Sequence, residues 1–120
     1  MKYYILKLLT TRSGIVTVYY RDDENLHEFN DELLEKHGTF YQLHIDEFEE
    51  TPSLKKVYEL KEFESIDIKP FMSTYCVYKE HGGELQITST VDGMSHCTCT
   101  MKEFMLAERS GNYSMLNWNQ

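Results

Sequence analysis

The spacing of the hydrophobic residues changes near residue 22, and this change restricts the folds open to the chain. Residues 3–9 are rich in aromatic and aliphatic side chains, and residues 15–20 alternate between two faces, as strands do. The short polar loop between them ends in Gly14, which favours a β-hairpin. Apolar residues then recur at helical spacing at three positions: Leu26, Phe29 and Leu33. A hairpin followed by an amphipathic helix over residues 26–36, packed in the core through these three residues, is therefore predicted.

Later segments of the chain return to strand patterns. The pattern recurs in four places: residues 40–45, 73–79, 84–91 and 95–100. The turn residues His81-Gly82-Gly83 and Asp92-Gly93 separate the last three segments and predict a meander. A short helix is expected to open at Thr100 or Lys102 and to end at Gly111.

Two stretches are less regular. Residues 47–54 are acidic and contain Pro52, so a loop is expected there. Residues 55–68 fit either a helix or a strand, and alternation over residues 65–68 favours a strand. The sequence predicts an α+β fold in a single domain of residues 1–120. We expect an antiparallel sheet of about five to seven strands with one amphipathic helix and a short C-terminal helix.

Acidic residues are concentrated between Asp22 and Glu50. Eleven of the 20 acids lie there beside a single base, Lys36, in a chain whose formal net charge is -8. Such a surface repels nucleic acid and attracts basic protein surfaces. Two interpretations stay open, because the acidic helix face is either a solvated exterior or a surface turned towards a partner.

The partner interpretation names a set of candidate contact residues. On the acidic segment and the strand before it they are Tyr19, Tyr20, Asp31 and Glu35. Trp118 joins them from the C-terminal tail, because Trp and Tyr are enriched where proteins bind one another. The tail also fits an alternative in which it packs within its own domain.

The cysteines and histidines give no convincing metal site. His96, Cys97 and Cys99 could offer soft ligands, with Cys76 as a fourth. However, one residue separates the two neighbouring thiols where zinc knuckles use two, and on a strand they would lie roughly 7 Å apart. We expect no bound metal and three free thiols, as in a reducing compartment.

Motifs for catalysis, cofactors and membranes are missing from the sequence. There is no Gly-x-Ser-x-Gly elbow, no Walker loop and no dinucleotide fingerprint. The first residues lack the features of a signal peptide, and no apolar run approaches the roughly 18 residues of a membrane span. We expect a cytoplasmic protein that is not an enzyme, needs no cofactor and binds neither membrane nor nucleic acid.

A short, acidic, tyrosine-rich chain without catalytic motif or export signal resembles the small proteins that phages encode to block bacterial defences. More narrowly, it is similar to phage inhibitors of a sirtuin-type NAD-degrading defence enzyme. The resemblance covers the chain by size and composition, including 9 tyrosines in 120 residues, and rests on no motif. It implies a protein-binding inhibitor in the host bacterial cytoplasm that prevents activation of a larger enzyme. The alternatives are an acidic mimic of nucleic acid and a Cys/His metal-binding protein.

Overall fold

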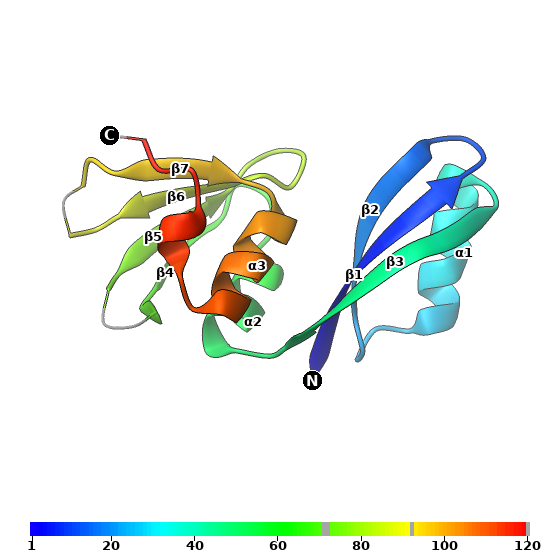
Figure 1. The fold of residues 1–120 in the computed structure, drawn as a ribbon, viewed down its shortest axis with the longest axis horizontal. Coiled ribbons are helices and arrows are strands. Elements are labelled where there is room, and N and C mark those ends of the chain that lie inside the picture. The colour runs from blue at the N-terminus through cyan, green and yellow to red at the C-terminus, as the bar shows by residue number, and fades with distance from the viewer. Residues whose placement is uncertain (71–72, 92, 120) are drawn as a thin grey trace. The chain divides into compact units, whose positions relative to one another are not determined.

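The computed structural model describes residues 1–70, 73–91 and 93–119. Its contacts group the chain into two compact units, residues 1–50 and residues 51–120. The predicted α+β class is confirmed (Figure 1). The seven strands of the described residues form two antiparallel sheets, not the single sheet that was expected. Alternation shows which residues are in strands, but it carries no information on which strands pair, because pairing is non-local.

The N-terminal unit is a three-stranded antiparallel sheet with one helix on one face (Figure 1). Its elements are β1 (Lys2–Thr10), β2 (Gly14–Arg21), α1 (Leu26–His37) and β3 (Phe40–Glu49). The strand order is β2-β1-β3, so β3 lies at one edge of the sheet. The predicted hairpin is confirmed, and Gly14 takes the positive φ of 67° that its turn requires.

Strand β3 is longer and less regular than the sequence suggested. It continues to Glu49, beyond the expected end at residue 45. Its pairing with β1 shifts register, because Lys7 faces His44 whereas Leu8 faces Gln42. Leu43 is therefore an extra residue, as in a β-bulge, and bulges locally bend and twist a strand.

Helix α1 confirms the strongest prediction from the sequence. The Asn25 side chain caps it by accepting a hydrogen bond from the Glu28 backbone N–H at 3.0 Å. At the other end Gly38 has a φ of 78° and donates its N–H to the Leu34 carbonyl. Leu33 packs against the sheet and completes a small core with two residues of β1: Leu6 and Leu8.

The C-terminal unit contains a four-stranded antiparallel sheet in the order β4-β5-β6-β7. Its elements are α2 (Pro52–Tyr58), β4 (Ser65–Ile68), β5 (Tyr75–Lys79), β6 (Leu85–Ser89), β7 (His96–Cys99), α3 (Met101–Ser110) and the 3-10 helix η2 (Tyr113–Met115). Asn119 forms an isolated bridge to His96 on the outer side of β7. The predicted meander is confirmed, although Asp92 of its second turn lies outside the described residues.

Helix α2 corrects two expectations. The stretch assigned to a loop ends in a helix, and the strand preferred for residues 55–68 holds only for β4 at its end. Thr51 caps α2, because its hydroxyl accepts a hydrogen bond from the Leu54 N–H at 3.1 Å. Pro52 occupies the first turn, where a missing N–H costs nothing.

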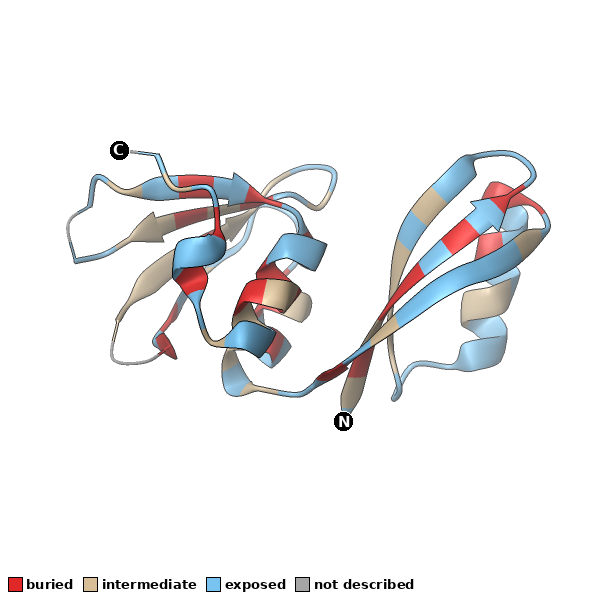
Figure 2. Ribbon diagram, in the orientation of Figure 1, coloured by how far each residue is buried: buried red, intermediate tan, exposed pale blue. Residues whose placement is uncertain are grey.

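The core of the C-terminal unit lies between its helices and its sheet. α2 and α3 lie side by side, and both carry buried residues (Figure 2). Val57 of α2 and Phe104 of α3 are fully buried. Thr100 caps α3 and forms a capping box with Glu103, and Gly111 ends the helix in a left-handed conformation, as the sequence predicted. No helix in the described parts of the chain is long and apolar enough to cross a membrane.

Candidate protein-binding groove

The predicted contact residues are not gathered in one place. Tyr19 and Tyr20 are neighbours on β2, and Asp31 and Glu35 are on α1, all four in the N-terminal unit. Trp118 belongs to the C-terminal unit. Tyr19 and Tyr20 point to opposite faces of the sheet, because successive residues of a strand do so. Tyr20 therefore lies on the face that carries α1, whereas Tyr19 lines a polar hollow at the β2 edge together with Glu28 and Glu32 of α1.

Tyr20 is held in an aromatic cluster beneath α1. Its ring centroid lies 4.9 Å from that of Phe29 and 6.1 Å from that of Tyr4. Its hydroxyl donates a hydrogen bond to the Glu24 carbonyl at 2.9 Å. Burial raises the pKa of Tyr20 above its ordinary value, and the Glu24 and Asp22 carboxylates add to the effect. The hydroxyl therefore stays protonated and acts as a donor.

Asp31 and Glu35 are exposed on α1, one turn apart. They lie on the side of the helix opposite Leu33, as helical spacing requires. Asp31 is 3.4 Å from the His27 ring, an ion pair only when that histidine is protonated. Both carboxylates are thus open to solvent. This fits a solvated helix face and a partner-binding face equally well.

Trp118 is largely engaged within its own unit. Its indole N–H donates a hydrogen bond to the Tyr113 carbonyl at 2.7 Å, and its ring centroid lies 5.5 Å from that of Tyr75. Tyr75 also stacks on the ring of Tyr113 at 5.5 Å. The tail therefore packs against the C-terminal unit, and Trp118 is half-buried there.

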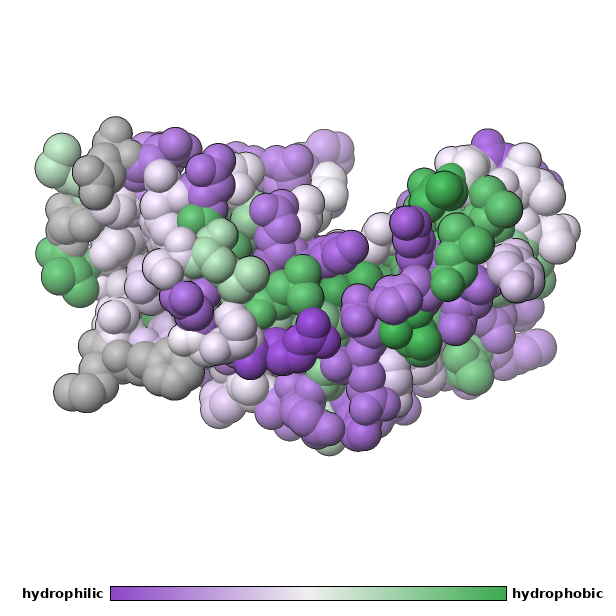
Figure 3. All heavy atoms as spheres, viewed as in Figure 1, coloured by the Kyte–Doolittle hydropathy of each residue, from purple (hydrophilic) through white to green (hydrophobic). Residues whose placement is uncertain are grey.

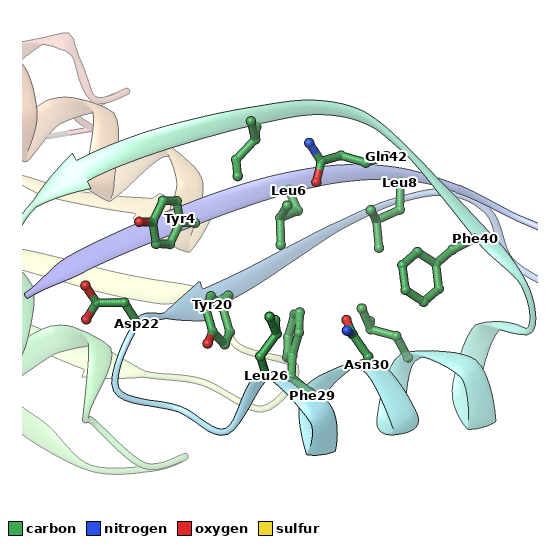
Figure 4. Close-up of a pocket in the computed structure, with 12 residues that line it drawn as sticks. Tyr4, Leu6, Leu8, Tyr20, Asp22, Leu26, Phe29, Asn30, Phe40 and Gln42 are labelled. Carbon is green, nitrogen blue, oxygen red and sulfur yellow. The ribbon is translucent and has the colours of Figure 1, made fainter.

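An apolar groove in the N-terminal unit has the strongest features of a binding site (Figure 4). It has a volume of about 380 Å³ and lies between α1 and the face of the sheet. Its lining comes from all four elements and from the loop before α1: Tyr4, Leu6, Leu8, Tyr20, Asp22, Leu26, Phe29, Asn30, Leu33, Phe40, Gln42 and Ile45.

The groove exists because one helix cannot cover three strands. Three strands are about 14 Å wide at their usual spacing, whereas a helix with its side chains is about 10 Å across. The partly buried residues around the small core come mainly from β2, with only Phe40 from β3. α1 thus covers the β2 side, and the strip over β3 stays open. Ile45 lines this strip and is 46% exposed.

Sequence spacing predicted the apolar face of α1 but not its burial. Leu33 is buried, as predicted, and Phe29 is half-buried. The expectation that Leu26 packs in the core is wrong, since Leu26 is 56% exposed and lines the groove. Periodicity places a residue on a face, and only the neighbouring elements decide whether that face is covered.

The opposite face of the same sheet also exposes apolar residues. Ile15 on β2 faces Leu9 on β1, which faces Tyr41 on β3, so the three side chains form a row across the sheet. All three are exposed. Among the described residues, eight of the twelve exposed large hydrophobic residues belong to residues 1–50, and Figure 3 shows such residues gathered on this unit.

The N-terminal unit also carries most of the net charge. It contains eleven acids and five bases, a formal charge of −6, which leaves −2 for the rest of the chain. Two of its bases are engaged by acids, because Lys2 lies 2.9 Å from Glu47 and Arg21 lies 2.6 Å from Asp23. The hydrogen bond that the Lys2 ammonium donates to the Glu47 carboxylate raises the pKa of Lys2. Asp22 is the acid that lines the groove, and the exposed acids of α1 lie on the outer side of that helix and on its β2 side.

The cysteines lie in the C-terminal unit and are free thiols, as the sequence predicted. Cys97 and Cys99 are buried side chains of β7 that point to the same face. The hydrogen bond with Cys97, together with burial, raises the pKa of the Cys99 thiol. In the described part of the chain no three His, Cys, Asp or Glu side chains are grouped so as to hold a metal ion.

Comparison of the chain with protein families, with curated proteins and with solved structures finds no match.

Proposed function

We propose that this protein acts by binding another protein through its N-terminal unit, without catalysis of its own. The observation that carries the proposal is the concentration of exposed hydrophobic residues on the unit that also holds most of the negative charge. Isolated exposed apolar residues are ordinary on any protein, but contiguous patches beside polar rims mark interaction surfaces. An apolar centre with a charged surround is the usual anatomy of a protein interface.

The partner that we propose is a larger bacterial defence enzyme, and the effect is to prevent its activation in the host cytoplasm. Support for this choice is the resemblance in size and composition to phage-encoded inhibitors, with a sirtuin-type NAD-degrading enzyme as the specific target. The acidic surface would speed the encounter with a basic patch of that enzyme. The apolar residues would then hold the complex, since buried anchors carry most binding energy.

The exposed apolar residues also separate this proposal from an acidic mimic of nucleic acid. A mimic binds through carboxylates placed like phosphates, so its complex weakens steeply as salt rises. A complex held by residues such as Leu9, Ile15 and Tyr41 loses less affinity to salt, because apolar burial is not screened.

The test is NAD consumption by a purified sirtuin-type defence enzyme with its activator, with and without this protein. We expect the wild-type protein to slow NAD loss and the double variant Leu9→Thr/Ile15→Thr to slow it less. Threonine is a good strand residue, so the sheet should be retained. The matched control is Val91→Thr, an 81% exposed residue of the other unit. No inhibition by the wild-type protein would exclude this target, and equal inhibition by all variants would exclude the exposed sheet face.

A further inference from the structure

We propose that the groove between α1 and β3 binds an amphipathic helix of a partner protein, and that this helix carries Lys and Arg beside its apolar face. The inference rests on the proposed function, because it names the kind of segment that the N-terminal unit takes. It concerns the groove face of the sheet, which is distinct from the row formed by Ile15, Leu9 and Tyr41 on the opposite face.

The helical layer of this unit is incomplete. Residues 1–50, all of which the structure describes, contain α1 as their one helix, and α1 covers the β2 side through the contact of Phe29 with Tyr20. The groove is apolar on its sheet side, where the exposed Ile45 of β3 lies beside the buried Leu6 and Leu8 of β1. A second helix lying parallel to α1, at the usual 8–10 Å between axes, would complete the layer. Its apolar side would bury Ile45 and Leu26, which line the groove and are exposed.

A helix fits this opening better than an added strand does. A strand would pair along the outer edge of β3 in the plane of the sheet, which leaves the groove empty. The extra residue Leu43 also interrupts the regular hydrogen-bonding pattern of β3, and such bulges discourage pairing at an edge. Residues 40–47 of β3 span about 23 Å, which matches a helix of about 15 residues.

Two side-chain amides line the groove. Asn30 on α1 and Gln42 on β3 both line the groove, and in Figure 4 the Gln42 side chain lies along the sheet. Neither amide forms a hydrogen bond with any residue that the structure describes. They can each donate to and accept from polar side chains of an incoming helix, and such paired contacts fix its position along the groove.

The charge around the groove selects the partner. Asp22 lines one end of it, and Asp31 and Glu35 are exposed on the outer side of α1, whereas Glu28 and Glu32 line a separate polar hollow beside Tyr19 of β2. The unit has a formal charge of −6, so a second copy of this chain would be repelled from the groove. A helix with basic residues flanking its apolar side is attracted instead.

The test uses synthetic peptides of about 15 residues, the length that matches β3. The probe places Leu at helical spacing on one side and Lys on the other. Three matched peptides change one property each: Ala in place of Leu, Glu in place of Lys, and the same Leu and Lys in strict alternation, which favours strands. Binding is followed by fluorescence anisotropy of the labelled peptide, and its location by NMR chemical shifts of the full chain.

We expect only the basic amphipathic helix to bind and to shift the signals of Ile45, Asn30 and Gln42. Ile45→Arg places a positive charge in the groove and should weaken binding on the order of tenfold. Val91→Arg, the matched change in the other unit, should leave it unchanged. The inference is overturned if the alternating, acidic or Ala peptide binds equally well, if Ile45→Arg and Val91→Arg act alike, or if the shifts map to Leu9 and Ile15.

These outcomes can be separated from failure of the proposed function. If the peptide binds the groove but NAD consumption is not inhibited, the proposed target is wrong and the groove assignment stands. If the peptide fails to bind the wild-type protein, and Ile45→Arg inhibits NAD consumption as well as the wild-type protein does, the groove assignment is wrong and inhibition stands.

Discussion

Two leucines of α1 show how residues with the same sequence pattern acquire different roles. Leu26 and Leu33 are seven residues apart, which places them on one side of the helix. Leu33 is 7% exposed and touches the core leucines of β1, whereas Leu26 is 56% exposed at the open groove. The side chains are identical, so the difference comes from what lies opposite each of them.

The two leucines should therefore contribute unequally to the free energy of unfolding, and a matched pair of alanine variants tests this. Leu33→Ala should lower the free energy of unfolding by about 2–5 kcal/mol, because it leaves a cavity in a small core. Leu26→Ala should lower it by about 1 kcal/mol or less, since little buried surface is lost. Urea unfolding followed by circular dichroism measures both. Equal losses would show that Leu26 is packed in the core.

Tyr113 makes the stability of the protein depend on pH. Burial, and the hydrogen bond that its hydroxyl donates to Glu108, raise the pKa of Tyr113 above its ordinary value. Below about pH 10 the hydroxyl is protonated in both states, so its full contribution to stability is present. Above that pH the unfolded chain loses the proton first, and stability falls as pH rises.

Tyr113→Phe tests this dependence, because it removes the titrating group and keeps the ring that stacks on Tyr75. Between about pH 10 and 11 the wild-type protein should lose up to about 1.4 kcal/mol more stability than the variant. Thermal unfolding at several pH values measures the difference. Parallel pH profiles would contradict a raised pKa at Tyr113.

At the scale of elements, α2 shows that a proline can begin a helix when a capping residue precedes it. Pro52 favoured a loop in the sequence, but at the first turn of a helix it replaces an N–H that has no partner. The Thr51 hydroxyl accepts a hydrogen bond from the Leu54 N–H and donates one to the Glu108 carboxylate. One threonine thus starts α2 and ties it to α3.

Replacing that threonine should weaken the C-terminal unit. Thr51→Ala removes both hydrogen bonds and should cost about 1–2 kcal/mol of stability. Thr51→Ser keeps the hydroxyl and should cost only a small part of this. Chemical unfolding of the two variants gives the comparison. If serine fails to preserve stability, the role of Thr51 lies in its methyl group and not in capping.

At the scale of the whole molecule, charge is unevenly divided. The N-terminal unit carries −6 of the formal net charge of −8, and the exposed acids of α1 contribute much of it. Exposed charges mainly steer association, while buried contacts set the rate of dissociation. The acidic residues should therefore change the rate of association, and the groove residues should change the rate of dissociation.

The double charge reversal Asp31→Lys/Glu35→Lys tests this division. It should slow association of the basic helical peptide and flatten the salt dependence of that rate, with dissociation little changed. Stopped-flow fluorescence at low and moderate salt measures both rates. The control is Glu62→Lys/Glu64→Lys in the other unit, both exposed. An unchanged association rate at low salt would show that the acids of α1 are solvated surface only.

The sequence by itself determined the local structure of most of the chain. Alternation marked the strands, helical spacing marked α1, and glycines marked the ends of α1 and α3, because these features depend only on near neighbours. The tertiary structure decided the rest. It divided the strands into two sheets and left β3 at an edge, since strand pairing joins residues far apart in sequence. It also decided that Leu26 and Ile45 line an open groove, because burial depends on whether another element covers a face.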